Sequence, residues 1–414
     1  MRIVRLSIAF GCLLLLCSCS TADRKPTVTQ VDPPPSVFVP ASDLPTAVAM
    51  NEDAGRGDLL IVTLRVEHGR EMPFIVDTGA PITCLDKSFE PELGKRIYEG
   101  TTFDGSGWKH KLRFYAAPKI YMGNTQLMTG SNVATMDVKW IGPQIHCPIM
   151  GILGMDCLSH YCIQLDFKAK QVRFLNPNQL DVAGLGKAFP LTFSGAEPPG
   201  MGWCGYPYIK DSPLTVFRTG EGDKRQDLPS IRLIDSGDPN DGALGASLFW
   251  RKVQKQRLRP DGNTARFDKC VWDGETYTNL IVEHLIMGNG DGSIGLAFLA
   301  RHLVTLNFPQ RVMYLKQTSI GPLADEDKER VWRFILASVR KKGGLPGRPP
   351  AGMASLDRTT DWPEDTFECV VYPKQNPTRY HYLIAQASEN EPWKFQKAWK
   401  TDAKGRTIEE YAVP

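Results

Sequence analysis

A short motif occurs twice in this chain of 414 residues: an apolar run, then an aspartate, a hydroxyl residue and a glycine. The sequence FIVDTGA carries it at Asp77–Gly79, and RLIDSGD carries it at Asp235–Gly237. In both copies the apolar run predicts a buried strand, and the glycine permits a tight turn that leaves the aspartate at the strand end. Burying a carboxylate there costs free energy unless it is paired or used. One such copy is most often an ordinary turn, whereas two copies indicate a pair of related sites.

A second pattern repeats further along the chain from each motif. The segment Ile152–Leu175 aligns with Ile294–Leu315 when Gly154 is placed on Gly295, with one single-residue gap before the final strands. Each copy predicts an apolar-glycine segment, a short helix and a hairpin. Because the motifs follow in the same order in both halves, the sequence predicts a duplicated lobe.

On these four segments the chain resembles the aspartic proteases, and within them the retropepsin-like and pepsin-like proteins of bacterial envelopes that hold two lobes in one chain. The resemblance covers residues 58–318. It implies a mainly β fold with two acid-protease lobes in tandem, and a catalytic pair formed by Asp77 and Asp235. The residues that it implies as supports of the two loops are Thr78, Gly79, Ser236, Gly237, Gly154 and Gly295.

Two carboxyl groups within hydrogen-bonding reach cannot easily both ionise. One stays protonated as general acid, while the other acts as base on a water molecule that attacks a peptide carbonyl without a covalent intermediate. This chemistry predicts an endopeptidase with a peptide or protein substrate, no cofactor and no metal. The histidines lack the spacing of metal ligands, and the formal charge of +3 gives no reason to expect nucleic acid as a partner. Since one chain supplies both halves of the site, we expect a monomer.

The second motif departs from the family pattern after its glycine. Gly79 is followed by Ala80, as is usual in the family, but Gly237 is followed by Asp238. This third carboxylate either points to solvent or crowds the catalytic pair and raises its pKa values. Two hypotheses stay open: an active enzyme, with a second lobe that is competent or degenerate, and a non-catalytic envelope protein that keeps the protease fold to bind peptides or act as a scaffold.

A glycine-containing hairpin is predicted between Phe103 and Phe114, with Trp108 near its tip. It is either the flap of the first lobe or an ordinary surface hairpin. The sequence GNGDG at residues 288–292 predicts a turn before the second apolar-glycine segment. A phosphate-binding loop is disfavoured there because no Lys-Ser or Lys-Thr pair follows.

The N-terminal residues predict export. Residues 1–18 combine two arginines with an apolar run too short to span a bilayer, which is typical of a signal peptide. Leu16–Cys19 resembles the bacterial lipobox, which implies lipidation of Cys19, and the alternative is an ordinary cleavable signal peptide. The proline-rich segment 19–50 predicts an extended tether. We expect a protein lipid-anchored to the bacterial cell envelope, on its periplasmic or outer-membrane side.

Three domains are predicted beyond the tether: a first lobe over residues 51–180, a second lobe over residues 181–320 and a C-terminal domain over residues 321–414. In the last of these, Leu323–Lys342 predicts a helix with one apolar face. Four strands are predicted after it, at Thr366–Tyr372, His381–Ala387, Trp393–Thr401 and Thr407–Val413. A helix followed by an antiparallel meander predicts a small α+β domain for binding or packing.

Overall fold

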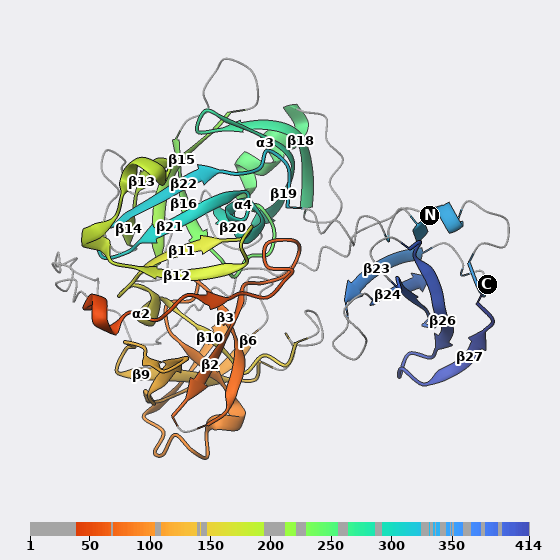
Figure 1. Cartoon of the computed structure of the whole chain (residues 1–414), viewed down its shortest axis with the longest axis horizontal. Coiled ribbons are helices and arrows are strands. Elements are labelled where there is room, and N and C mark those ends of the chain that lie inside the picture. Colours follow the sequence, from red (N-terminus) through yellow and green to blue (C-terminus); the bar gives the residue numbers. More distant parts are fainter. Residues whose placement is uncertain are drawn as a thin grey trace. The chain divides into compact units, whose positions relative to one another are not determined.

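The computed structural model describes the chain from residue 39 to residue 413, with internal gaps (Figure 1). The residues outside this description are 1–38, 68, 104–108, 139–140, 142–146, 194–211, 221–228, 256–263, 286–291, 324–330, 332–333, 336, 340–344, 348, 350–351, 359–365, 374–376, 388–390 and 414. The chain divides between Leu323 and Ala324 into two compact units. Both aspartate motifs belong to the larger unit.

The first lobe is a β-sheet that holds Asp77 at the end of a central strand. Its strands are β2 (Ile61–Val66), β3 (Glu71–Val76), β4 (Cys84–Asp86), β5 (Tyr98–Phe103), β6 (Lys109–Ala116), β7 (Ile120–Met122), β8 (Thr125–Gln126), β9 (Asn132–Met136) and β10 (Gly151–Leu153). They lie in the order β5-β6-β9-β4-β10-β3-β2-β7-β8. β3 pairs with β10 in parallel and with β2 antiparallel, so the strand that leads to Asp77 is fixed on both sides.

The second lobe repeats this arrangement around Asp235. Its strands are β14 (Thr192–Phe193), β15 (Pro213–Gly220), β16 (Pro229–Asp235), β17 (Gly242–Gly245), β18 (Thr264–Trp272), β19 (Glu275–Leu285) and β20 (Ser293–Gly295). The sheet order is β17-β19-β18-β15-β16-β20, and β14 pairs with β15. β16, which ends in Asp235, pairs with β20 in parallel and with β15 antiparallel. The strands that carry the two aspartates therefore have equivalent neighbours.

A third sheet joins the lobes (Figure 1). Its strands are β1 (Val48–Ala49), β11 (Cys162–Asp166), β12 (Gln171–Leu175), β13 (Lys187–Pro190), β21 (His302–Asn307) and β22 (Val312–Gln317), in the order β1-β12-β11-β21-β22-β13. In the antiparallel pair of β11 and β21, Gln164 lies opposite Thr305. The sequence repeat also aligns Gln164 with Thr305, and equivalent residues face each other in this way only about a twofold axis. The two lobes are therefore related by a pseudo-twofold axis.

A short helix follows each apolar-glycine segment, as predicted: α2 (Met155–Leu158) in the first lobe and α4 (Leu296–Leu299) in the second. The longer helix α3 (Ala246–Lys255) belongs to the second lobe. Single 3-10 turns are η1 (Ala41–Asp43), η2 (Lys87–Phe89), η3 (Pro177–Gln179) and η4 (Val182–Gly184). One buried apolar cluster contains side chains of both lobes, among them Phe74, Phe167 and Phe298. Because they share this core, the two lobes form one body.

The smaller unit is an antiparallel meander with helical residues packed on it. Its strands are β23 (Gly352–Arg358), β24 (Thr366–Pro373), β25 (Arg379–Ala385), β26 (Lys394–Thr401) and β27 (Thr407–Tyr411), paired in that order. The four predicted strands are present, whereas β23 was missed because the Gly/Pro-rich sequence before it indicates a loop. In the predicted helix, Val331 and Ile335 are helical and buried in the core of this unit. The predicted mainly β architecture of tandem lobes is confirmed.

Candidate active site

Each aspartate loop folds back on its own carboxylate. Asp77 Oδ1 accepts hydrogen bonds from the backbone N–H groups of Gly79 at 2.7 Å and Ala80 at 3.2 Å. Asp235 Oδ1 likewise accepts from the N–H of Gly237 at 3.0 Å. The two aspartates are 2% and 1% exposed, respectively. The tight turns predicted from the glycines thus aim amide hydrogens at buried carboxylates, which favours the charged form.

The two loops are locked together by an exchange of hydroxyl groups. Thr78 Oγ1 donates to the carbonyl of Ile234 at 2.7 Å and accepts from the N–H of Ser236 at 3.0 Å. Ser236 Oγ donates to the carbonyl of Val76 at 2.8 Å and accepts from the N–H of Thr78 at 3.0 Å. These four buried bonds cross between the lobes and obey the pseudo-twofold axis. They make the relative position of the loops rigid.

The carboxyl groups of Asp77 and Asp235 meet between these loops. Hydrogen bonding with the Asp235 side chain is among the influences that lower the pKa of Asp77, so the two carboxyl groups lie close together. Each carboxyl also packs on the glycine of the opposite loop: a Cβ on Gly79 would stand 2.5 Å from Asp235 Oδ1, and a Cβ on Gly237 would stand 2.5 Å from Asp77 Cγ. Only glycine leaves room for this approach. The structure therefore brings together the pair that the sequence predicts.

Burial raises the pKa of Asp77 to about 6, against an ordinary value of 3.8. Hydrogen bonds from the backbone of Gly79 and Ala80, and the bond with Asp235, work in the opposite direction and offset part of this rise. A hydrogen bond between two carboxyl groups needs a proton on one of them. The pair is thus suited to holding a single proton, as general acid–base chemistry requires.

The apolar-glycine segments lie against the loops as predicted. In the first lobe the N–H of Met155 donates to the carbonyl of Ala80 at 2.8 Å, and in the second the N–H of Leu296 donates to the carbonyl of Asp238 at 2.7 Å. A Cβ on Gly154 would stand 2.6 Å from the backbone of Ile82, and one on Gly295 would meet the carbonyl oxygen of Asn240 at 2.3 Å. Both glycines are therefore required by close backbone contact.

Asp238 takes neither of the orientations that the sequence suggested. It is 1% exposed, so it does not point to solvent. Its Oδ1 accepts from the N–H of Asn240 at 3.0 Å, and its Oδ2 accepts from Ser293 Oγ at 3.2 Å. These bonds direct the carboxyl toward β20. Burial raises the pKa of Asp238 to about 7, to which the nearby charge of Asp241 contributes.

Sequence reasoning missed four residues that brace the loops, and two of them, Thr83 and Asp241, sit at equivalent places in the two lobes. Each of these two residues follows the aspartate of its loop, Asp77 or Asp235, by six positions. Thr83 donates its hydroxyl to Asp156 Oδ1 at 2.7 Å, whereas Asp241 forms a buried ion pair with Arg301, whose Nε lies 2.9 Å from Asp241 Oδ1. Their equal distance from the two aspartates was the signal in the sequence that could have identified Thr83 and Asp241. The sequence did not reveal their roles, because Thr83 bonds to Asp156 whereas Asp241 pairs with Arg301.

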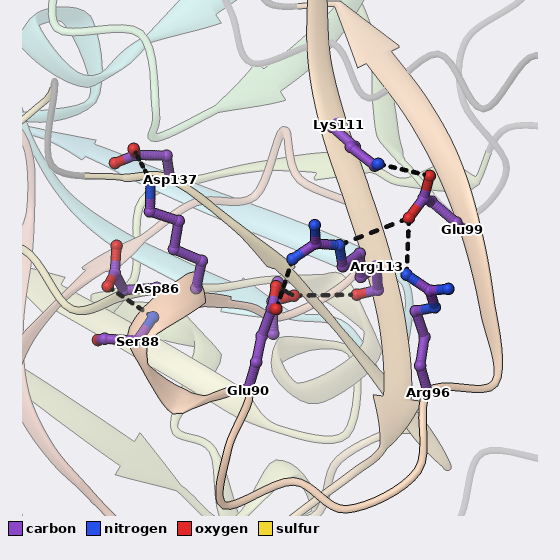
Figure 2. Close-up of polar contacts among 10 residues, drawn as sticks. Asp86, Ser88, Glu90, Arg96, Glu99, Lys111, Arg113 and Asp137 are labelled. Atoms are coloured by element: carbon purple, nitrogen blue, oxygen red, sulfur yellow. Dashed lines mark hydrogen bonds and ion pairs between the residues drawn. The ribbon is translucent and has the colours of Figure 1, made fainter.

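The predicted hairpin between Phe103 and Phe114 is present as β5 and β6, which pair from Tyr98↔Phe114 to Phe103↔Lys109. Its tip, with Trp108, lies outside the described residues. Figure 2 shows how its base is tied down: Glu99 pairs with Arg96, Lys111 and Arg113, and Arg113 also pairs with Glu90. Glu90 follows η2, just after the first aspartate loop and β4, so ion pairs connect the hairpin to that segment.

The described residues contain no group of three or more His, Cys, Asp or Glu side chains arranged to hold a metal ion. Cys19 and most of the GNGDG sequence lie outside the description. Among the helices of the described ranges, none is long and apolar enough to cross a membrane.

Comparisons with known proteins found one family match and similar solved structures. A protein-family model described as "Aspartyl protease" matches residues 62–157, which contain the first aspartate loop. Two solved structures with weak similarity are an aspartic proteinase from Irpex lacteus (TM-score 0.40, 13% identity) and Basic 7S globulin from soybean (TM-score 0.39, 11% identity). Each comparison covers 66% of this chain, with 97% and 96% of the other chain. No curated protein sequence matches the chain.

The fold and the paired loops define a two-lobed β protein with an aspartate dyad. The family match over residues 62–157 relates the first lobe to the aspartic proteases. This resemblance rests on that match together with the site geometry.

Proposed function

We propose that this protein is an aspartic endopeptidase that hydrolyses peptide bonds with a water molecule activated by Asp77 and Asp235. The observation that carries the proposal is the close approach of the two buried carboxyl groups, each packed against the glycine of the opposite loop, in loops held by the exchange between Thr78 and Ser236. An acid group and a base group that are held side by side suit general acid–base catalysis and need no cofactor.

In this mechanism the pair begins with one proton. The ionised carboxylate takes a proton from water while the oxygen of that water bonds to the peptide carbonyl carbon. The protonated carboxyl gives its proton to the carbonyl oxygen, which yields a neutral tetrahedral diol. The carbon–nitrogen bond then breaks: the leaving nitrogen takes a proton from one carboxyl, and a diol hydroxyl returns its proton to the other. The products are an acid and an amine, and the pair again holds one proton.

The decisive experiment measures cleavage of a peptide library by the full chain and by two variants, Asp77→Asn and Asp235→Asn. An amide is nearly the same size as a carboxyl but cannot exchange the proton, so each change should abolish cleavage. Circular dichroism and thermal unfolding should stay close to those of the wild type. Cleavage that survives Asp235→Asn alone would mean that the second lobe is not catalytic.

A wild-type chain that cleaves nothing at any pH would overturn the proposal. The protein would then be a peptide-binding or scaffold protein with the protease fold. Direct binding of library peptides to the wild type, measured by calorimetry, would distinguish these two roles.

For its location, we propose export, lipidation at Cys19 and anchoring to the bacterial envelope. The support is the short apolar run and the lipobox-like Leu16–Cys19 sequence. Replacing Cys19 with Ala should release the protein from the membrane fraction and abolish incorporation of a labelled fatty acid. Membrane fractionation of the variant, together with unlabelled wild-type protein, would contradict the anchor.

A further inference from the structure

A buried carboxyl stands behind the second aspartate loop at a position that the first lobe fills with alanine. Ala80 packs in an apolar cluster of its lobe, whereas Asp238 occupies the equivalent place in the second lobe. The fold can therefore be built without a carboxyl there. Burial of Asp238 disfavours its charged form, so the carboxyl costs free energy at neutral pH unless its contacts compensate.

These contacts fasten the loop to the strand beside it. Ser293 donates its hydroxyl to Asp238 and accepts from the N–H of Ala243 at 2.9 Å. Ser293 begins β20, and Gly295 of β20 pairs with Asp235 itself. Asp238 thus links the residue three positions after Asp235 to the strand that flanks Asp235, and through Ser293 to β17.

The first lobe has a similar link, but there the carboxyl comes from the helix after the apolar-glycine segment and not from the aspartate loop. Asp156 of α2 reaches back to the loop, where its Oδ1 accepts from both the N–H and the hydroxyl of Thr83, at 2.6 and 2.7 Å. The repeat places Asp156 on Ala297 and Ala80 on Asp238. Each lobe therefore has a carboxyl that ties its loop to its apolar-glycine segment: half-buried Asp156 belongs to that segment, whereas buried Asp238 belongs to the loop.

We propose that Asp238 is a positioning residue for Asp235, and that Asp156 has the same role for Asp77 through its bonds to Thr83. The inference rests on the proposed function, since positioning matters to turnover only if Asp235 is catalytic. Asp238 acts on the loop backbone through Ser293 and Asn240, and it takes no part in bond making or breaking.

The kinetic test uses Asp238→Ala, Asp238→Asn and the matched control Glu283→Gln. Glu283 is also a buried carboxyl, but its hydrogen bond to the loop comes from a side chain, the amide of Asn240, rather than from the loop backbone. Asp238→Ala should lower kcat by about 10- to 100-fold with little change in KM, because a displaced reacting group affects turnover more than substrate binding. Asp238→Asn keeps the acceptor for Asn240 and should restore most of kcat. Glu283→Gln should stay near wild type.

Hydrogen exchange gives a readout that does not need activity. In Asp238→Ala, exchange should become faster in residues 233–241 and stay unchanged in residues 74–83, while Asp156→Ala should show the reverse. If wild type is inactive but this pattern appears, the proposed function fails and the positioning of Asp235 stands. Unchanged exchange in residues 233–241, or an equal loss of kcat in all three kinetic variants, would overturn the inference.

Discussion

The carboxyl carbon of Asp77 lies 2.5 Å from the point where a Cβ on Gly237 would stand, and the carboxyl carbon of Asp235 lies 2.8 Å from the corresponding point on Gly79. Each lobe therefore supplies not only its own aspartate but also the empty space into which the opposite aspartate fits. The pair of carboxyl groups therefore forms only where the two lobes meet. Substitution of Gly79 or Gly237 should disturb this pair more than substitution of a glycine with free space around it.

Adding a methyl group at Gly237 should separate the two carboxyls. We expect Gly237→Ala to reduce kcat by about 100-fold or more, since displacements near 1 Å at a reacting group have effects of this size. Peptide hydrolysis measures the effect. Gly184→Ala is the matched control, because a Cβ at Gly184 meets nothing within 4 Å and activity should be unchanged. Equal activity of the two variants would contradict the close approach.

The hydroxyl of Thr78 should contribute to the docking of the lobes. Thr78→Val keeps the shape of the side chain but removes the bonds to Ile234 and Ser236, which leaves buried backbone groups without their partner. We expect a loss of about 1–3 kcal/mol in the free energy of unfolding, measured with urea. Thr63→Val on the exposed face of β2 serves as control and should have little effect. A Thr78→Val protein as stable as this control would show that the exchange is not stabilising.

The pH–rate profile should be bell-shaped, because hydrolysis needs one proton on the carboxyl pair. Since the pKa of Asp77 is raised to about 6, the pair loses its last proton as the pH rises through that region, and kcat/KM should fall above about pH 6. At low pH the second carboxyl also becomes protonated and the rate falls again. Rates measured from about pH 3 to about pH 8 test this. A rate that keeps rising above about pH 7 would contradict a shared proton.

Stability should also depend on pH through Glu283. Burial and the neighbouring charge of Asp238 raise the pKa of Glu283 to about 9, against an ordinary 4.5. Between these values the folded chain holds a proton that the unfolded chain has released, so stability falls as the pH rises, by at most about 1.4 kcal/mol per pH unit. Glu283→Gln keeps a neutral group of the same shape. It should match wild type near pH 4.5 and be more stable near pH 8 in urea unfolding. If the free energy of unfolding differed between Glu283→Gln and wild type by the same amount at both pH values, titration of Glu283 would not be the cause.

The two aspartates and the duplication that relates them could be predicted from the amino-acid sequence alone. Asp77 and Asp235 are recognisable because their neighbours are local: an apolar strand before each, and a glycine that permits the turn after each. The short helices α2 and α4 were predictable for the same reason. Hydrogen bonds within a turn and the burial of a strand depend on residues adjacent in the chain.

The contacts by which these parts support one another could not be predicted from the sequence, because they join residues that are far apart in the chain. The Thr78 hydroxyl bonds to Ile234, 156 residues away, and Asp156 bonds to Thr83, 73 residues away. Asp238 could not be assigned from its neighbours because Ser293, its partner, is 55 residues distant. Buried polar groups must find partners wherever the packed chain offers them. The partners depend on which strands and loops the fold brings together, and this cannot be predicted from the residues next to each group in the sequence.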